Sequence, residues 1–365
     1  MALKAGIVGL TNSGKTTIFN CISNTKAEAT NFAFSTSQSN FGTAQVADPR
    51  LYELDKLIQA EKVIPATLEL VDIPGLAKGA SQGEGIGNTF LNDVRNMDAL
   101  IHVVRCFDDD NLPHMEGSID PVRDKEILDF ELQVKDLDQI EKKLQKVEKA
   151  YKTGDKTLKP AYDSLIKFKT QLEELKNVRD LELDKNDEEL IHELFLLTAK
   201  PVMYVCNVDE ASAVEGNEYS KAFITAVEKE NTETVIVAGK SEAEISELED
   251  EEDREVFLSD LGLSEPGVHR MTRAAYKMLN LISFFTVGGK ENRAWSIRKG
   301  LNAQQAAGTI HSDLERGFIR AEVISYEDMI EFKSEAACKE KGKMRLEGKT
   351  YIVQDGDIMH VRFNV

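Results

Sequence analysis

Eight residues near the N-terminus, Gly9-Leu-Thr-Asn-Ser-Gly-Lys-Thr16, have the types and spacing needed to hold a chain of phosphates. The glycines let backbone N–H groups close around phosphate oxygens, Lys15 can reach the β and γ phosphates, and the Thr16 hydroxyl can ligate Mg2+. The pattern lies between an apolar run and a helix-compatible segment, so it predicts a P-loop nucleotide hydrolase. The loop residues expected to bind the nucleotide are Asn12, Ser13, Gly14, Lys15, Thr16 and Thr17, with Lys15 also catalytic.

A second phosphate-sensing element, Asp72-Ile-Pro-Gly75, ends the apolar run Thr67–Val71. Asp72 can hold the metal through a water, and the Gly75 N–H can sense the γ phosphate. Asp-x-x-Gly alone is a common tetrapeptide, but behind a strand that follows a P-loop it is the expected switch. Between the two elements, "NFAFSTSQSN" holds several hydroxyls, among which we choose Thr36 as a second Mg2+ ligand. The predicted metal ligands are thus Thr16, Thr36 and Asp72.

The tetrapeptide Asn207-Val-Asp-Glu210 stands where a GTP-binding protein carries Asn-Lys-x-Asp, the motif that reads guanine. The Asp of that motif accepts from the guanine N1–H and 2-amino group, whereas adenine offers neither donor. Here Glu210 is one methylene longer than Asp, and Val208 replaces Lys. Losing a paired buried polar contact can cost about 10⁴-fold in discrimination, so guanine should lose its advantage. The alternative is that Glu210 still accepts from guanine after a small shift.

Short apolar runs recur along the chain, each followed by turn or helix-start residues. Fully apolar runs of this length suit strands that are buried on both faces of a mainly parallel sheet, which predicts an α/β fold. About a hundred residues separate the third run from the fourth, far more than one crossover helix requires. A further element is therefore inserted there. The runs are Leu3–Val8, Thr67–Val71, Ala99–Val104, Val202–Cys206 and Thr234–Val237.

The inserted segment contains two amphipathic stretches on either side of Gly154. Apolar residues recur every three or four positions and charged residues fill the other faces, which predicts an antiparallel coiled-coil arm. The pattern is compatible with a solvated hairpin and with an arm that contacts a partner. The apolar positions are Phe130, Val134, Leu137, Ile140, Leu144, Val147 and Tyr151, then Tyr162, Leu165, Phe168, Leu172 and Leu175.

Residues 281–365 differ from the rest of the chain in charge and pattern. They carry 13 Lys and Arg against 12 Asp and Glu, a net charge of +1, whereas residues 1–280 carry −20. Apolar strand-like segments around a short helical stretch at Ala303–Ile310 predict a small mixed sheet wrapped around one helix. A basic cluster could meet RNA phosphates, and a solvated edge loop fits equally well. The cluster consists of Lys339, Lys341, Lys343, Arg345 and Lys349.

The overall charge of −19, from 45 basic and 64 acidic residues, argues against indiscriminate binding to nucleic acid or to an anionic membrane. The cysteines, Cys21, Cys106, Cys206 and Cys338, lack the spacing of zinc sites or disulfide frameworks and are expected to be reduced thiols. No apolar stretch approaches the ~18 residues that span a bilayer. We therefore expect no membrane partner and a cytoplasmic location.

Six segments carry a family resemblance: "GLTNSGKTTIFN", "NFAFST", "VDIPGLAKGASQGEGIGNTFL", "DALIHVVRCF", "NVDE" and "AAGTIHSDLERGFIRAEVISYEDM". Together they resemble the Obg-like ATPases of the YchF family, over essentially the whole chain. The resemblance implies an Obg-type nucleotide domain at 1–124 and 201–280, a coiled-coil arm at 125–200 and a TGS domain of β-grasp shape at 281–365. It also implies a preference for ATP and association with the ribosome, as the large subunit or a 70S-type particle. By the family's pattern, Asn207 and the backbone of Val208 would meet the adenine edge, and Gly239 would lie in the facing loop.

The sequence lacks the usual residue that orients water for hydrolysis. Many small GTPases place a Gln directly after Asp-x-x-Gly, whereas this chain has Leu76, which can neither donate nor accept a hydrogen bond. Slow intrinsic turnover is therefore expected. His114 in "DDDNLPHMEG" matches a position to which the resemblance points and is our candidate to position the water; a plain surface histidine is the other interpretation. Asn12 suggests a K+ site, since related P-loop proteins bind K+ through an Asn at this position.

These features favour an ATP-binding and ATP-hydrolysing switch that uses Mg2+ and associates with the ribosome. The alternative is an Obg-type GTPase in ribosome assembly, with "NVDE" a tolerated variant. A nucleotide-binding scaffold with incidental hydrolysis is a third class, which Leu76 favours. A scaffold would show tight binding with negligible turnover even when ribosomes are added.

Overall fold

The computed structural model describes residues 3–23, 39–76 and 86–364, and the chain divides into two compact units. The N-terminal unit comprises Met1–Gly42 and Glu69–Met271, and the C-terminal unit comprises Thr43–Leu68 and Thr272–Val365. The expected division assigned all of residues 1–124 to the nucleotide domain. The structure groups residues 43–68 with the C-terminal unit instead, because the helix and the strand that they form pack against the C-terminal sheet.

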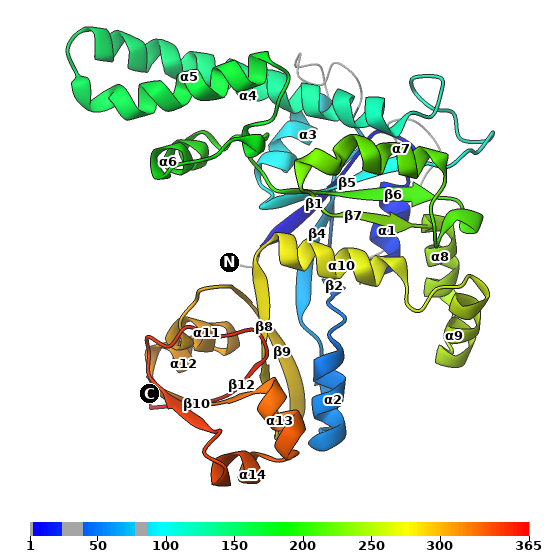
Figure 1. Ribbon diagram of the computed structural model, residues 1–365, viewed down its shortest axis with the longest axis vertical. Helices are drawn as coiled ribbons and strands as arrows, with labels where there is room; N and C mark the ends of the chain where they lie inside the picture. Colours follow the sequence, from blue (N-terminus) through cyan, green and yellow to red (C-terminus); the bar gives the residue numbers. More distant parts are fainter. Residues whose placement is uncertain (1–2, 24–38, 77–85, 365) are drawn as a thin grey trace. The chain divides into compact units, whose positions relative to one another are not determined.

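A mainly parallel sheet forms the centre of the N-terminal unit, in the order β2-β4-β1-β5-β6-β7 (Figure 1). β1 pairs in parallel with β4 and β5, and β6 pairs in parallel with β5 and β7. Every residue of β5 is buried, as expected for a strand that is covered on both faces. The predicted α/β class is confirmed, since each predicted apolar run is a strand of this sheet. The strands are β1 (Lys4–Val8), β2 (Asn40–Gln45), β4 (Thr67–Asp72), β5 (Ala99–Cys106), β6 (Val202–Val208) and β7 (Thr234–Val237).

Helices of this unit pack on the sheet through apolar side chains. Phe90 and Val94 cluster with side chains of β1, β4 and β5, while Phe223 clusters with side chains of β5 and β6. The loop after β1 leads directly into α1, so the N-terminus of α1 lies at the carboxyl edge of the sheet, where ligands of such folds bind. The helices are α1 (Lys15–Ile22), α3 (Ile86–Arg95), α7 (Glu218–Val227), α8 (Gly239–Glu247), α9 (Glu251–Asp260) and α10 (Gly267–Met278).

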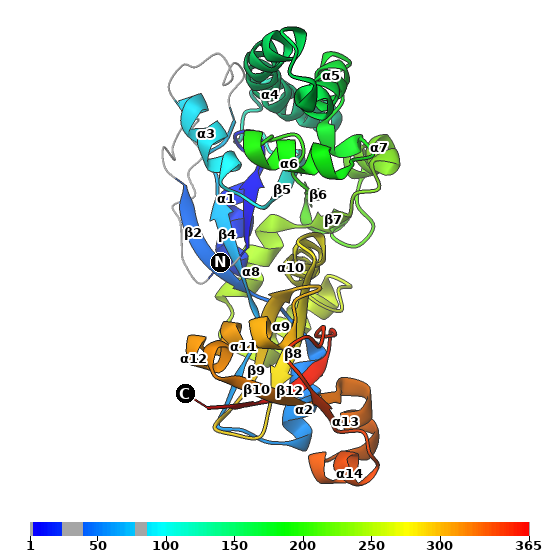
Figure 2. The same cartoon turned by 90° about the vertical axis from the view of Figure 1, so that its left-hand side faces the viewer.

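The long insertion forms α4 (Pro121–Lys152), α5 (Lys159–Glu173) and α6 (Lys185–Leu194). Figure 2 shows α4 and α5 side by side, in agreement with their packing contacts. Gly154, with a φ of 117°, lies in the turn between them. The predicted helical arm is therefore confirmed. Its apolar seam contains Ile140, Val147, Leu165, Phe168 and Leu172.

The first half of α4 belongs to the core of the unit rather than to the arm. Leu128 and Leu132 pack with side chains of β1 and β4, whereas Phe130, which was expected to begin the apolar stripe, is 49% exposed. The expectation for Phe130 is wrong because this part of the helix buries carboxylates as well as apolar groups. Asp124 and Asp129 are among these buried carboxylates.

The C-terminal unit contains a mixed sheet in the order β11-β10-β12-β8-β9-β3. β10 is antiparallel to β11 and β12, and β8 is antiparallel to β9, whereas β12 runs parallel to β8 and β3 runs parallel to β9. α11 packs on it through Ala303, Ala306 and Ala307, which confirms the predicted sheet around a helix. The elements are β3 (Lys62–Ile64), β8 (Leu281–Thr286), β9 (Glu291–Arg298), α11 (Ala303–Ile310), α12 (Ser312–Arg316), β10 (Phe318–Ser325), α13 (Tyr326–Phe332), α14 (Glu335–Glu340), β11 (Arg345–Glu347) and β12 (Asp357–Phe363).

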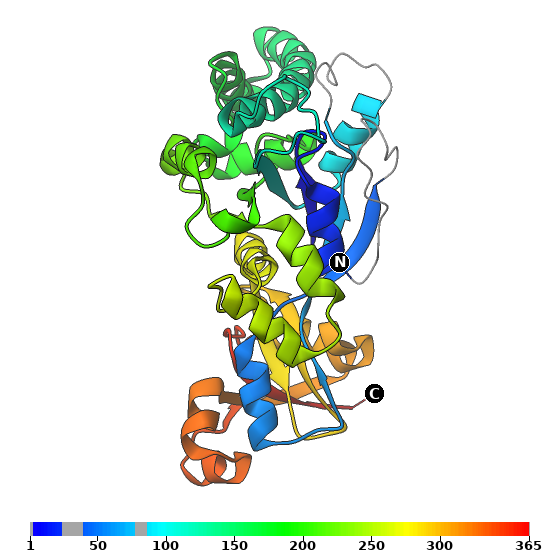
Figure 3. The same cartoon turned by 90° about the vertical axis from the view of Figure 1, so that its right-hand side faces the viewer.

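Helix α2 (Pro49–Leu57) also belongs to the C-terminal unit and lies beside β9, as its blue ribbon in Figure 3 shows. Arg50 pairs with Asp48 at 2.8 Å and with Asp355 at 2.9 Å, which ties the start of α2 to the loop before β12. Asn292 donates to Asp55 at 2.7 Å. Among the helices that the structure describes, none is long and apolar enough to cross a membrane.

Candidate nucleotide-binding and hydrolysis site

The predicted phosphate loop joins β1 to α1. Gly9 lies so close to β5 that a Cβ would stand 2.4 Å from the Val103 carbonyl oxygen. Asn12 and Gly14 have positive φ angles of 65° and 89°, which are typical of loops whose N–H groups form an anion-binding concavity. Because Lys15 is the first residue of α1, the loop also presents the positive end of a helix dipole. This geometry suits phosphate oxygens.

Lys15 and Gly75 come from distant segments and lie side by side. Lys15 is 7% exposed, and its Nζ donates to the Leu10 carbonyl at 3.4 Å. Burial lowers the pKa of Lys15, and the charge of Asp72 opposes this change. A Cβ at Gly75 would stand 3.1 Å from Lys15 Nζ and 2.9 Å from Thr11 Oγ1. The structure thus brings together the two groups that were expected to contact the γ phosphate.

Thr16 and Asp72 also meet in the structure. Thr16 Oγ1 donates to Asp72 Oδ2 at 2.8 Å, and Asn40 Nδ2 donates to the same oxygen at 3.4 Å. Burial raises the pKa of Asp72, although Lys15, Thr16 and Asn40 act in the opposite direction. Asn40 was missed by the sequence reasoning, because only the packing of β2 beside β4 brings it to Asp72. Thr36 lies outside the described residues.

The donors around Asp72 fit a hard divalent cation. Asp72 is 2% exposed, and its Oδ1 has no hydrogen-bond partner among the described residues. In the described part of the chain, no group of three His, Cys, Asp or Glu side chains is placed to hold a metal ion, so these side chains alone do not form a closed metal cage there. An oxygen-only, incomplete donor set is typical of Mg2+ sites that the substrate phosphates and waters complete.

Asn207, the first residue of the tetrapeptide Asn-Val-Asp-Glu, connects two segments of the chain. It is 4% exposed, its Nδ2 donates to the Ser13 carbonyl at 3.0 Å, and its Oδ1 accepts from Gly239 N at 2.9 Å. A Cβ at Gly14 would stand 2.1 Å from Asn207 Nδ2. The side chain therefore fixes the spacing between the phosphate loop and the first residue of α8. A direct contact of Asn207 with adenine stays a prediction.

Val208 and Glu210 differ in exposure. Val208 ends β6 and is 2% exposed, so the position of the motif's Lys is used for packing. Glu210 is exposed and opens the short helical turn Glu210–Ser212, which Asp209 caps. The Glu210 carboxylate, at the end of the tetrapeptide, therefore lies at the surface.

Leu76, which stands where many GTPases carry Gln, is directed into the core. It is 1% exposed and belongs to a cluster with Leu10, Ile73 and Phe90. Its N–H donates to the Gly9 carbonyl at 3.2 Å. The Leu76 side chain is thus packed among apolar groups, and it carries no atom that could orient a water.

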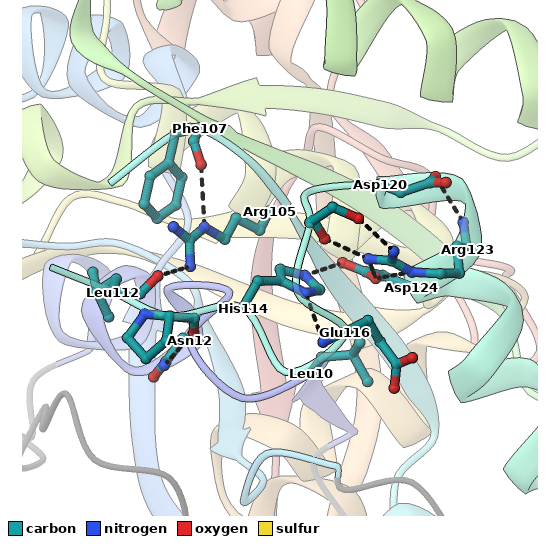
Figure 4. Close-up of polar contacts among 12 residues, drawn as sticks. Leu10, Asn12, Arg105, Phe107, Leu112, His114, Glu116, Asp120, Arg123 and Asp124 are labelled. Carbon is teal, nitrogen blue, oxygen red and sulfur yellow. Dashed lines mark hydrogen bonds and ion pairs between the residues drawn. The ribbon is translucent and has the colours of Figure 1, made fainter. Parts of the chain in front are cut away.

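The loop that follows β5 is folded back by Arg105, which the sequence reasoning did not single out (Figure 4). Arg105 is 2% exposed, and its guanidinium lies 4.7 Å from the centre of the Phe107 ring. The phosphate loop holds the same loop further along, since Asn12 Nδ2 donates to the Pro113 carbonyl at 3.1 Å. Arg105 donates to three carbonyls of this loop, those of Phe107 at 3.1 Å, Asp109 at 3.3 Å and Leu112 at 2.8 Å.

His114 follows this tethered proline and is buried in a polar contact with the start of α4. Its side chain is 6% exposed, and Nε2 lies 2.8 Å from Asp124 Oδ2. Nδ1 accepts from Glu116 N at 3.1 Å. The interpretation of His114 as a plain surface residue is therefore wrong. Its role in positioning water stays a prediction.

A parallel sheet that brings Lys15, Gly75 and the Thr16–Asp72 pair to one loop defines a P-loop nucleoside triphosphatase. Residues 4–149 match a family model described as 50S ribosome-binding GTPase. Residues 281–364 match the C-terminal YchF-GTPase model, described as a protein of unknown function (DUF933). A protein of Haemophilus ducreyi named Ribosome-binding ATPase YchF is 49% identical over 365 residues, covering 100% of both chains. The chain belongs to the YchF family.

Further relatives extend this similarity over both units. A Bacillus subtilis protein with the same name is 46% identical over 367 residues and is covered completely. The structure titled "Structure of the Schizosaccharomyces pombe YchF GTPase" matches with a TM-score of 0.86 at 35% identity, covering 99% of this chain and 97% of that one. The family resemblance expected from the sequence is therefore confirmed.

Proposed function

We propose that this chain binds and hydrolyses ATP at its phosphate loop and associates with the ribosome as a nucleotide-dependent switch. The observation that carries hydrolysis is the convergence of Lys15, Gly75 and the Thr16–Asp72 pair. The bacterial relatives are named ribosome-binding ATPases over their full length. The yeast structure is titled a GTPase, so the choice of nucleotide is the property to measure first.

Each residue of the site has a distinct task in this proposal. Lys15 places its charge at the β and γ phosphates, and the Gly75 N–H meets the γ phosphate. Thr16 and Asp72, with Thr36 as a further candidate, would hold Mg2+, which neutralises phosphate charge when it is bound. Asn207 keeps the loops around the base at a fixed spacing. His114 would orient the attacking water.

The first prediction concerns the preference of the site for adenine over guanine. In a competition titration on nucleotide-free protein, ATP should displace a fluorescent nucleotide at least about tenfold more tightly than GTP, which is about 1.4 kcal/mol. The physical reason is that Glu210 is too long, and Val208 too apolar, for the paired guanine contacts. The variant Glu210→Asp gives this exposed side chain the length found in Asn-Lys-x-Asp and should move the preference towards GTP.

The outcomes of this titration separate the candidate functions. Tighter GTP displacement by the wild-type protein would favour the Obg-type GTPase. Tight ATP binding with negligible turnover, even with ribosomes present, would favour the nucleotide-binding scaffold.

A second prediction concerns K+, which we propose as a further cofactor held by Asn12. The Asn12 Nδ2 donates to the Pro113 carbonyl. The other end of the amide, the Asn12 Oδ1, is therefore the atom that can face a cation. ATP turnover should be faster in KCl than in NaCl at equal ionic strength, and Asn12→Ala should abolish the difference. Equal rates of the wild-type protein in both salts would reject the K+ site.

We also propose that residues 281–364 form a TGS-type domain that meets ribosomal RNA, and that the protein acts in the cytoplasm with its ribosomal partner. Two residues of the basic cluster are already paired, Lys343 with Asp328 at 3.0 Å and Arg345 with Asp357 at 3.2 Å. The RNA contacts are therefore assigned to Lys339, Lys341 and Lys349, which are exposed.

A further inference from the structure

Asp124 connects His114 to the helix that begins the arm. It lies in the first turn of α4 and is 3% exposed. Its Oδ2 lies 2.8 Å from His114 Nε2, and its Oδ1 accepts from Arg123 Nη2 at 3.0 Å. Figure 4 shows the carboxylate between the imidazole and the guanidinium. A buried carboxylate with both oxygens engaged is held in one orientation.

Capping of this helix end is the task of a different carboxylate. Asp120 is the N-cap residue of α4, and its side chain accepts from Arg123 N at 3.1 Å. Asp124 instead bonds the side chains of His114 and Arg123. Helix capping therefore does not account for the position of Asp124.

The two contacts of the imidazole define its tautomer. Nδ1 accepts from the Glu116 N–H, so this nitrogen carries a lone pair. The ring proton is then on Nε2, where it is donated to Asp124. In a histidine, the hydrogen bond at one nitrogen decides what the other nitrogen can do. Asp124 thereby makes Nδ1 the acceptor, which is the form that can accept a hydrogen bond from water.

We propose that Asp124 is a positioning residue for ATP hydrolysis, because it keeps His114 in the tautomer whose Nδ1 can accept from the attacking water. This inference rests on the proposed function and on His114 as the group that orients the water. The water oxygen forms a bond to the γ phosphorus while the bond to the bridging oxygen of ADP breaks. The electron pair of that bond leaves with ADP, and the proton lost by the water ends on a phosphate oxygen. Asp124 neither gives nor takes a proton in this step.

The loop allows Nδ1 to exchange its present partner for water. The Glu116 N–H is only two residues from His114, and Gly117 follows with a φ of 76°, so the contact is local and the chain beyond it is adaptable. The hydrogen bond from Asn12 to the Pro113 carbonyl ties the backbone that precedes His114 to the phosphate loop during this exchange. For Nδ1, the exchange replaces one neutral hydrogen bond by another.

Asp124→Asn tests the proposal in the full-length protein. An amide can donate to Nε2 and so favour the tautomer with its proton on Nδ1, which cannot accept from water. We expect kcat for ATP to fall at least about tenfold, a part of the ~10²–10⁴-fold that a positioned histidine can contribute, while KM and nucleotide affinity stay unchanged. Phosphate release at saturating MgATP and a nucleotide titration measure the two quantities.

Matched variants separate this role from a structural one. Asp120→Asn removes a carboxylate from the same helix end without touching His114 and should retain kcat. In a His114→Ala background, Asp124→Asn should cause no further loss, because the two residues act as one unit. If Asp124→Asn does not fold, Asp124→Glu keeps the charge but moves the carboxylate by one methylene, and the same comparison applies.

The results are decisive in each case. A wild-type kcat in Asp124→Asn, or a loss of equal size in the His114→Ala background, overturns the assignment. If the wild-type protein does not hydrolyse ATP, this result would instead refute the proposed function on which the inference rests.

Discussion

Replacing Gly14 by alanine should lower the affinity for ATP by about a hundredfold. A Cβ at this position would stand 2.1 Å from Asn207 Nδ2, and the backbone has a φ of 89°, which side chains with a Cβ rarely adopt. The left-handed conformation costs about 1–2 kcal/mol, and displacing Asn207 breaks two hydrogen bonds worth about 1 kcal/mol each. The loop of the variant relaxes to avoid this strain. Binding must restore it, and about 2.7 kcal/mol corresponds to a hundredfold in affinity.

A second glycine provides the matched control for this prediction. Gly300 has a similar φ of 94°, but a Cβ there would meet nothing within 4 Å. Gly300→Ala should therefore show the backbone strain alone, as a small loss of stability with unchanged ATP affinity. Isothermal titration of both variants measures the difference. Wild-type affinity in Gly14→Ala would mean that Asn207 does not hold the phosphate loop in the binding conformation.

The phosphate end of the site could be predicted because its determinants are local. Gly9, Gly14 and Lys15 act through the backbone of one loop and through the first residue of a helix, and both follow from eight consecutive residues. Asp72 was predicted as a metal ligand together with Thr16, and the carboxyl ends of parallel strands meet at one edge of a sheet, which brings the end of β4 to the phosphate loop. Burial and strand order in the structure agree with this reasoning.

The side-chain contacts of Asn207 and Leu76 could not be predicted in the same way. The sequence places Asn207 in a known motif, but the direction of its amide depends on Ser13 and Gly239, which are far away along the chain. Leu76 likewise was recognised as an unusual residue, whereas its burial in the core depends on how the chain turns after β4. Side-chain direction is a property of the packed state and not of the local pattern.

The grouping of residues 43–68 with the C-terminal unit was missed for a related reason. β3 is short and only partly buried, so it carries no alternation or apolar run that would mark it as a strand. Its pairing joins Lys62 to Glu291, which no local periodicity encodes.

The apolar stripe predicted for α4 is wrong at Phe130. The first half of this helix buries charged residues, whereas the sequence pattern predicted that charged residues would face solvent.

Asp129, in the first half of α4, should make the largest contribution to the free energy of unfolding that we can assign to one side chain. Asp129 accepts from Lys125 at 2.8 Å and from Arg179 at 2.9 Å, and all three side chains are at most 12% exposed. Lys125 also pairs with Glu230 at 2.7 Å. Asp129→Asn leaves the Arg179 charge buried without its counter-ion, so the free energy of unfolding should fall by about 3–5 kcal/mol.

An exposed ion pair on the same helix gives the control. Asp138 pairs with Lys142 at 2.6 Å, but the Asp138 side chain is 52% exposed. Water screens such pairs, and Asp138→Asn should cost at most about 1 kcal/mol. Urea unfolding followed by circular dichroism compares the two variants with the wild-type protein. Equal losses of unfolding free energy in both variants would show that burying the ion pairs of Asp129 adds nothing to stability.

The pH dependence of the Asp129 effect has a definite sign. Burial alone would raise the pKa of Asp129, but the charges of Arg179 and Lys125 outweigh it and lower the pKa to about 2. An unfolded Asp has a pKa of about 3.9, so the folded state holds the ionised form more strongly than the unfolded state does. The stabilisation is therefore complete above about pH 4 and is lost as the pH falls towards 2. The difference in unfolding free energy between wild type and Asp129→Asn should shrink over that window, and a difference that stays constant down to pH ~2 would contradict the ionic origin of the contribution.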